Sequence, residues 1–265
     1  MTIASIGDIH GRPIWKIFLF GSYEGYEAWR NGSTEIFPID AFDIVVFIGD
    51  YVDSFDVSNV EIKGNLLDII HLRNTLPHKI KLLIGNHDHA YMIHPPDVQI
   101  SGFRPEIALD LNQIFRENLS IFDAAYQYKN TIWTHAGIHE GWWKVYASRD
   151  IRDLEGKYKR IFGEPTSDMS IADIINNLYL INAPSIHMIS FHRSTYGKKV
   201  GGPLWADKIE TSKKPLKGYD QIIGHTPVKR MLEMLKLNKK TKELISLSYI
   251  DCLGGDEPLI KIKTY

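Results

Sequence analysis

The sequence predicts an α/β protein whose core sheet is extended or faced by a second sheet. Three observations support this. Short apolar runs recur along the chain, and each ends at a polar cluster that in most cases contains a glycine. Segments with helical spacing lie between these runs, whereas the C-terminal part contains strand patterns only. Strands alternating with helices and followed by strands alone favour this architecture.

The apolar runs have the length and composition of buried strands. Each has four or five residues, mostly β-branched or large apolar ones, which is typical of strands covered on both faces. In most of them a glycine follows the run, where it allows a sharp turn and a close approach to a ligand. The runs span residues 3–6, 44–48, 80–84, 131–134 and 220–223.

Helices are predicted between these strands. Proline is tolerated at a helix start, and Ser170 or Asp168 can cap the last helix. The expected helices span residues 14–29, 60–76, 106–119 and 171–180. Two C-terminal strands, 243–253 and 259–265, are expected around a turn at 254–258, and either could close the second sheet or pair with another subunit. Irregular segments that could cover a site are expected at 31–39, 89–104 and 195–217.

Composition bounds the class of protein. The chain has 265 residues and shows no linker, so we expect one domain over residues 1–265. The formal charge is −1, from 31 basic and 32 acidic residues, which gives no global attraction to nucleic acid or to an anionic membrane. Cys252 is the only cysteine, and neither a leader pattern nor an 18-residue apolar run occurs. We therefore expect a cytoplasmic protein.

The strand ends carry a set of metal-ligand side chains. Because the carboxyl ends of neighbouring strands converge in α/β sheets, these side chains are expected to meet. The set contains Asp8, His10, Asp50, Asn86, His135 and His225. Such a mixture of carboxylate, amide and imidazole suits Mn²⁺, Fe or Zn²⁺. Six ligands fit two metals with a shared carboxylate, and two such metals can clamp a phosphate.

These residues lie in motifs that resemble a known family. The motifs are GDIHG (7–11), GDYVD (49–53) and GNHD (85–88), followed by histidines in THAG (134–137) and GHTP (224–227). They resemble the calcineurin-like metallophosphoesterases, and within that superfamily the phosphoprotein phosphatase branch, including its bacterial and phage members and the diadenosine tetraphosphatases. The resemblance covers residues 7–227. It implies a two-sheet β-sandwich flanked by helices, with a dinuclear metal centre at one edge.

The resemblance also implies roles for individual residues. Asp8 and His10 match ligands of the first metal, and Asp50 matches the bridging carboxylate. The second-metal ligands match Asn86, His135 and His225. His87 matches the acid that protonates the leaving alkoxide, and Asp53 matches the carboxylate that orients it.

Elementary chemistry supports these roles. An alkoxide is a strong base, so its departure needs an acid with a pKa near neutral, and histidine is the natural donor. Two divalent ions, for which we expect Mn²⁺, lower the pKa of bound water to about 7 and so supply hydroxide that attacks phosphorus directly.

Two positions depart from the family pattern. The phosphoprotein phosphatases usually continue GDYVD with an arginine that grips phosphate, but this chain has Ser54. Arg193 and Arg12 are the candidate replacements. The other departure is Asp88, where glutamate is commoner, and aspartate can do similar supporting work with a shorter reach.

The sequence leaves three functions open. The first is a phosphatase acting on phosphomonoesters, above all phosphoserine or phosphothreonine in proteins. The second is a hydrolase of dinucleoside polyphosphates or of nucleic-acid ends, which the missing arginine would allow. The third is a metal-binding phosphate-recognition module without catalysis, against which His87 and Asp53 argue. The expected partner is a phosphorylated substrate, and the oligomeric state stays open.

Overall fold

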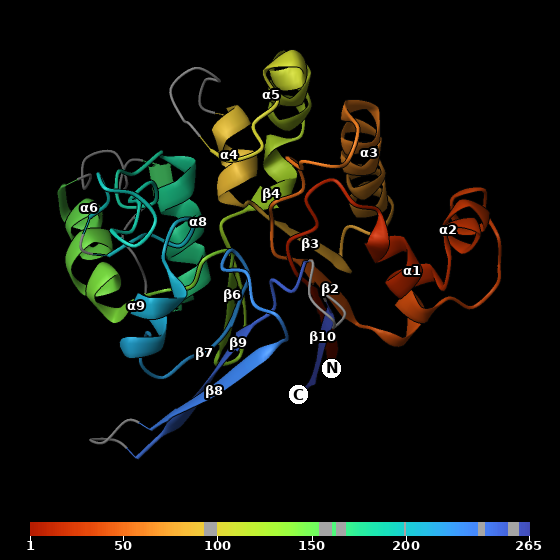
Figure 1. Ribbon diagram of the computed structural model, residues 1–265. Coiled ribbons are helices and arrows are strands. Elements are labelled where there is room, and N and C mark those ends of the chain that lie inside the picture. Colours follow the sequence, from red (N-terminus) through yellow and green to blue (C-terminus); the bar gives the residue numbers. More distant parts are fainter. Residues whose placement is uncertain (93–99, 154–160, 163–167, 199, 238–241, 254–259) are drawn as a thin grey trace.

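The computed structural model describes the chain apart from residues 93–99, 154–160, 163–167, 199, 238–241 and 254–259. Two five-stranded sheets face each other, and helices cover their outer sides (Figure 1). The expected α/β sandwich of two sheets flanked by helices is therefore confirmed. Among the described residues, none of the helices combines the length and the hydrophobicity that crossing a bilayer requires.

Each sheet has a parallel centre. The first sheet has the order β10 (Ile260–Thr264), β1 (Thr2–Ile6), β2 (Ile44–Phe47), β3 (Ile80–Leu83) and β4 (Phe122–Asp123). The second has the order β5 (Ala125–Tyr128), β6 (Thr131–Thr134), β7 (Asp220–Ile223), β9 (Leu244–Tyr249) and β8 (Leu232–Leu237). Strands β1 to β4 are parallel, as are β6, β7 and β9, whereas β10, β5 and β8 pair antiparallel. The carboxyl ends of the parallel strands therefore lie together at one edge of each sheet.

The two sheets are joined through an apolar layer that contains a buried polar link. The indole Nε1 of Trp133 on β6 donates to Ser5 Oγ on β1 at 2.8 Å, and both residues are buried. A buried indole requires such a partner for its N–H group. Around this link pack fully or almost fully buried side chains from both sheets: Ile3, Val46, Ile48, Leu83, Ile222 and Ile250.

Helices cover the outer side of each sheet. Those beside the first sheet are α1 (Ile14–Phe20), α2 (Tyr23–Arg30), α3 (Asn59–Thr75), α4 (Asn86–Met92) and α5 (Ala108–Glu117). Those beside the second sheet are α6 (Ser148–Asp153), α8 (Ile171–Leu180) and α9 (Lys208–Lys213). Short 3₁₀ turns span Pro38–Ala41, Pro105–Ile107 and Leu119–Ile121, and a π-helical segment spans Trp142–Ala147. The expected cap by Ser170 is present, because its side chain accepts from the backbone N–H of Asp173.

The single helix expected over residues 14–29 is wrong. The structure has two helices there, and the break falls at Gly21 and Ser22. Gly21 has a φ of 80°, a left-handed conformation that ends α1, and the Ser22 side chain accepts from the N–H of Gly25 to start α2. Helical spacing of the apolar residues continues across the break, which is why periodicity alone does not reveal it.

The two expected C-terminal strands are present, but they belong to different sheets. β9 lies in the second sheet, between β7 and β8, whereas β10 pairs antiparallel with β1 at the edge of the first sheet. The turn expected at 254–258 lies outside the described residues. The chain therefore contributes one C-terminal strand to each sheet.

Other differences concern short elements. The expected irregular segment 195–217 contains α9, which begins at the Asp207 cap. Residues 89–92 belong to α4, and most of the rest of the expected segment 89–104 is not described. The strands β4, β5 and β8 were not predicted, since β4 and β5 are short and β8 mixes apolar with charged residues.

Candidate active site

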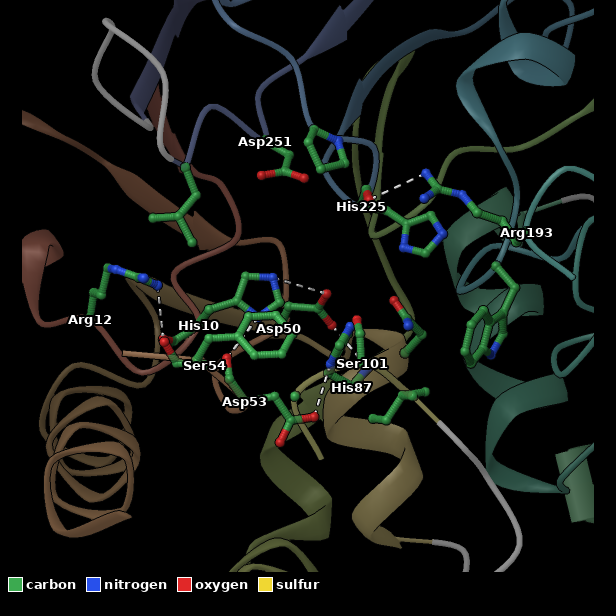
Figure 2. A pocket seen from close by; sticks show the side chains of 17 residues that line it. His10, Arg12, Asp50, Asp53, Ser54, His87, Ser101, Arg193, His225 and Asp251 are labelled. Atoms are coloured by element: carbon green, nitrogen blue, oxygen red, sulfur yellow. Dashed lines mark hydrogen bonds and ion pairs between the residues drawn. The ribbon is translucent and has the colours of Figure 1, made fainter. Parts of the chain in front are cut away.

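The predicted ligands meet at the edge where the parallel strands end. Asp8 follows β1, Asp50 follows β2, Asn86 follows β3, and the two histidines 135 and 225 follow β6 and β7. A cavity of about 480 Å³ opens onto this cluster (Figure 2). Most of the predicted site residues line it, whereas Asp8 and His135 are fully buried behind its wall. The structure thus brings both sheets to one site.

The ligand atoms fall into two groups that share a carboxylate. One group contains Asp8, His10 and Asp50, and the other contains Asp50, His135 and His225. Within each group the ligand atoms lie within 4.8 Å of one another. Asp50 Oδ2 is 3.8 Å from His10 Nε2 and 3.4 Å from His135 Nε2, so this carboxylate stands between the groups. Asn86 Oδ1 lies 2.8 Å from His135 Nε2 and belongs with the second group.

The imidazoles are oriented as metal ligands. His135 Nδ1 donates to the Ile48 carbonyl at 3.0 Å, and His10 Nδ1 faces the carbonyls of Val52 and Asp53 at 3.1 and 3.0 Å. Because carbonyls only accept, each Nδ1 carries the proton and each Nε2 turns a lone pair into the cluster. His135 Nε2 meets His225 Nδ1 at 3.1 Å.

These contacts test whether metal ions fit. Lone-pair donor atoms converge from several side chains, and within the described chain the buried Asp8 Oδ1 has no hydrogen-bond partner. Buried acceptors facing one another are unfavourable unless a cation lies between them. The mixture of two carboxylates, one amide and three imidazoles suits borderline divalent metals. The residues present therefore fit a pair of such ions.

Burial sets the charges of these ligands. It lowers the pKa of His10, His135 and His225, which favours the neutral form that has a lone pair for a metal. Burial also raises the pKa of Asp8 well above its ordinary value, with the carboxylate of Asp251 adding to the effect. Asp50 differs: burial raises its pKa, but the neighbouring imidazoles outweigh burial and hold it below the usual range.

Unusual backbone conformations aim these side chains. His10, Asp50, Asp53 and His225 have φ between 45° and 63°, in the left-handed region that residues other than glycine seldom adopt. Glycine is needed where the neighbouring chain passes very close to one of the candidate ligands. A Cβ at Gly224 would overlap the Asp8 carboxylate.

Asp88 fixes the loop that carries the shared carboxylate. Its Oδ2 accepts from the N–H groups of Asp50 at 2.7 Å and Gly85 at 2.9 Å, and its Oδ1 accepts from Tyr51 at 2.8 Å. The loops after β2 and β3 are thereby tied together by one buried side chain. Aspartate reaches these three donors at this position, where glutamate is commoner in the resembling family.

A histidine and an aspartate form a hydrogen-bonded pair beside the candidate metal ligands. His87 Nδ1 lies 2.9 Å from Asp53 Oδ2, and the ring makes an edge contact with His10 at 5.0 Å. Burial lowers the pKa of His87, but Asp50 and Asp53 outweigh it and raise the value to about 9. Before metals bind, His87 is therefore protonated at neutral pH. Its position at the first turn of α4 places it in the cavity wall.

Tyr91 holds the other oxygen of the Asp53 carboxylate. The Tyr91 hydroxyl donates to Asp53 Oδ1 in a short hydrogen bond, and it accepts from the backbone N–H of Arg104 at 2.8 Å. Tyr91 is fully buried and stacks on Phe103 at a centroid distance of 4.7 Å. Each oxygen of the Asp53 carboxylate thus has its own partner, and the carboxylate is fixed in both position and orientation.

The two candidate arginines approach the cavity from opposite sides (Figure 2). Arg12 forms an ion pair with Asp56. Arg193 Nε lies 2.9 Å from Asp207 Oδ2, and its Nη2 donates to the His225 carbonyl at 3.3 Å and to a neighbouring threonine. Each guanidinium is therefore positioned by a carboxylate.

Sequence reasoning missed several residues of this site. Asp251, which is buried, lines the cavity two positions after β9, so it stands at a strand end like the other candidate ligands, but serines 246 and 248 interrupt the apolar residues of that strand. In most of the other motifs a glycine directly precedes the ligand residue, whereas Ile250 precedes Asp251. This is why sequence reasoning did not identify Asp251. Phe55 at the rim, with 85% of its surface exposed, and Tyr91 behind Asp53 had no local signal.

Fold and site together define a class of protein. A two-sheet α/β sandwich with two ligand groups at its strand ends, and a histidine–aspartate pair beside them, is the arrangement of a metal-dependent phosphoester hydrolase. The family model for calcineurin-like phosphoesterases matches residues 1–245, and the chain belongs to this family. Comparison with curated protein sequences gave no match.

Two solved structures agree on the fold, and a third is similar at a lower level. A cold-active protein-tyrosine phosphatase from a psychrophilic Shewanella species is 16% identical, with a TM-score of 0.50, over 98% of this chain and 74% of that one. Another structure of a cold-active protein tyrosine phosphatase is 15% identical, with a TM-score of 0.53, over 98% of this chain and 73% of that one. A serine/threonine phosphatase from Saccharomyces cerevisiae is 13% identical with a TM-score of 0.44, over 100% and 79% of the two chains.

Proposed function

We propose that this protein is a phosphatase of the phosphoprotein phosphatase type that hydrolyses phosphomonoesters, with phosphoserine and phosphothreonine as its substrates. The observation that carries the proposal is the pair of His87 and Asp53, joined at 2.9 Å beside the shared carboxylate of Asp50. A serine or threonine alkoxide is a poor leaving group, and such a pair supplies the proton it needs. We propose these two residues as the catalytic acid and its orienting partner.

The metal ligands in this proposal are the six strand-end residues. Asp8 and His10 hold the first ion, Asp50 bridges, and the second ion is held by Asn86, His135 and His225. Two ions held there, which we propose to be Mn²⁺, would neutralise phosphate charge and activate water. The buried, unpartnered Oδ1 of Asp8 supports this assignment. Because the ligands come from both sheets, we propose that residues 1–265 form one catalytic domain.

The remaining residues position the substrate. Arg12 and Arg193 would bind the non-bridging phosphate oxygens from two sides, in place of the arginine that Ser54 replaces. Asp56 and Asp207 support this role by holding the two guanidinium groups toward the cavity. His87 then stands on the side from which the leaving oxygen departs, and Asp53 keeps its Nδ1 proton in place so that Nε2 is free to donate.

The test is turnover of a phosphoserine peptide by Mn²⁺-loaded protein, compared for wild type and His87→Asn. Asparagine retains a polar side chain of similar reach but has no acidic proton. We expect the variant to keep its metal content and to lose at least about 100-fold in kcat on the peptide, within the range for general acid catalysis. Metal content by plasma mass spectrometry is the control. An unchanged rate would remove His87 from the mechanism, and metal binding without any turnover would leave only a phosphate-binding module.

One observation favours a second substrate class. Phe55 presents an almost fully exposed ring at the cavity rim, beside Ser54, where a nucleobase could stack. The alternative is therefore a hydrolase of dinucleoside polyphosphates or of phosphorylated nucleic-acid ends. Comparing kcat/KM for diadenosine tetraphosphate, a 5′-phosphorylated oligonucleotide, and phosphoserine and phosphotyrosine peptides separates the two. A preference for the phosphoserine peptide that is unaffected by Phe55→Ala would exclude the alternative.

A further inference from the structure

Arg193 lies in the wall of the catalytic cavity on a loop that is exposed along one side (Figure 2). The loop runs from Ile189 to Lys198, and two backbone hydrogen bonds of 2.7 Å close it, from the Lys198 N–H to the Ile189 carbonyl and from the Phe191 N–H to the Lys198 carbonyl. Phe191 and Tyr196 are 62% and 93% exposed, so they do little to hold the loop against the rest of the protein. The position of Arg193 therefore depends on contacts at the inner side of the loop.

Ser190 makes the inner contact closest to Arg193. It is fully buried, and its carbonyl accepts from the backbone N–H groups of Arg193 at 2.9 Å and Ser194 at 3.2 Å. Its hydroxyl accepts from the N–H of His192 at 3.1 Å and donates to Glu210 Oε2 at 2.9 Å. The backbone of Arg193 is thus joined to Glu210 through a single intervening residue.

Glu210 is a buried carboxylate that joins both ends of this segment. It lies in the first turn of α9 and is 5% exposed. Besides the Ser190 hydroxyl, it accepts at Oε1 from the backbone N–H groups of Gly201 at 2.7 Å and Asp207 at 3.2 Å. Burying a carboxylate is unfavourable unless hydrogen bonds compensate it, so these donors are held firmly. Ser190 precedes Arg193 and Gly201 follows it, so one side chain fixes the segment on both sides of the arginine.

The same helix also fixes the guanidinium group. Asp207 caps α9 by accepting from the N–H of Ile209 at Oδ1, at 2.7 Å, and its Oδ2 lies 2.9 Å from Arg193 Nε. The helix is in turn attached to the second sheet, because the hydroxyls of Thr211 and Tyr249 on β9 are hydrogen-bonded at 2.9 Å. Helix α9 therefore sets where the backbone and the charged end of Arg193 lie relative to the strand ends.

We propose that Glu210 is a positioning residue, which holds the loop through Ser190 so that the Arg193 guanidinium meets phosphate in the catalytic cavity. This inference rests on the contact between Arg193 and phosphate in the proposed function, and it adds a residue that does not itself line that cavity. The physical reason is geometric. A guanidinium binds two phosphate oxygens in one plane, so a change in its orientation weakens the contact even though its charge is kept.

The experiment measures binding of inorganic phosphate to Mn²⁺-loaded protein by calorimetry, for wild type, Glu210→Gln, Arg193→Ala and the double variant. Glutamine keeps the shape of the side chain, but its NH₂ group cannot accept a hydrogen bond from the donors that face the carboxylate. We expect Kd to rise about threefold to tenfold in Glu210→Gln and at least about tenfold in Arg193→Ala. The double variant should bind phosphate as Arg193→Ala does, because Glu210 has no further effect once the arginine side chain is absent.

Two more variants separate positioning from damage to the fold. Ser190→Ala removes the link to the loop and leaves the cap of α9 in place, so it should weaken phosphate binding to the same degree as Glu210→Gln. Asp173 is the matched control, because it occupies the same third position in α8 and the same kind of cap. Asp173→Asn should bind phosphate as wild type does. Melting temperatures of all variants show that they are folded, and Ser190→Ala decides the outcome if Glu210→Gln is not.

Normal phosphate affinity in both Glu210→Gln and Ser190→Ala would overturn the positioning role. So would losses that multiply in the double variant, because they would show that Glu210 acts independently of Arg193. Phosphate binding needs no turnover, and hydrolysis of a phosphoserine peptide by wild type is measured separately. Coupled losses in phosphate affinity without any hydrolysis would contradict the proposed function and support the positioning role.

Discussion

Replacing Tyr91 by phenylalanine tests how strongly the proposed catalytic acid, His87, depends on the residues that hold Asp53. The change removes one hydroxyl that donates to Asp53 and accepts from the Arg104 N–H, and the stacking on Phe103 is retained. A hydrogen bond to a charged acceptor contributes about 1.5–3 kcal/mol. If the transition state loses this whole stabilisation, kcat falls about 10- to 100-fold. The loss should depend on how much the leaving group needs a proton.

The assay therefore compares two substrates. For a phosphoserine peptide, whose alkoxide requires His87, we expect kcat to fall about 10- to 100-fold in Tyr91→Phe. For p-nitrophenyl phosphate, whose leaving group is a weak base, we expect a much smaller change. The matched control is Tyr179→Phe, because that buried hydroxyl contacts Met92 Sδ at 3.2 Å and not a catalytic residue. An equal loss on both substrates would show that Tyr91 matters only for folding, and no loss would refute the positioning role.

Three further outcomes are expected. Gly224→Ala should reduce the Mn²⁺ content by plasma mass spectrometry, because its Cβ would overlap the Asp8 carboxylate, whereas Gly64→Ala, with open space around it, should not. In metal-free protein, His87 has a pKa raised to about 9, so its stabilisation is present below about pH 6.5 and lost as pH rises through 9. The difference in melting temperature between wild type and His87→Asn should therefore shrink over that interval, and a constant difference would contradict the assignment. Arg193→Lys should raise KM and weaken inhibition by phosphate several-fold, since lysine cannot bind two oxygens in one plane; unchanged phosphate inhibition would exclude the contact.

The strand-end pattern made much of the site visible in the sequence. The local signal is an apolar run followed by a glycine and a ligand residue. It identified Asp8, Asp50 and His225 as candidate ligands. The structure adds why glycine is needed: the chain approaches a carboxylate so closely at Gly224 that a side chain cannot fit. The helices were predicted for a similar reason, since caps such as Ser170 act over a few residues.

What could not be predicted depends on contacts between distant segments. Tyr91 supports Asp53 from 38 positions away, and the Trp133–Ser5 link joins residues 128 positions apart. The sheet assignment of the last two strands depends on which edge is free, because β10 completes the first sheet beside β1. No short window of sequence holds that information. Asp251 is an intermediate case. The strand before it was predicted from the sequence, but its closeness to Asp8 was not.

The loop after β2 shows how the protein can dispense with the usual arginine. Ser54 Oγ donates to Asp56 Oδ1 at 2.7 Å, and the same carboxylate pairs with Arg12 from the loop after β1. Arg104 donates to the carbonyl of Ser54 and, at 3.0 Å, to that of Val57, and these two bonds hold the loop in place. Because β1 and β2 are parallel neighbours, a guanidinium that leaves the end of β1 reaches the region that one following β2 would occupy. In the proposed function, Arg12 would therefore supply this positive charge from the adjacent strand, while Arg193 lines the cavity on its other side.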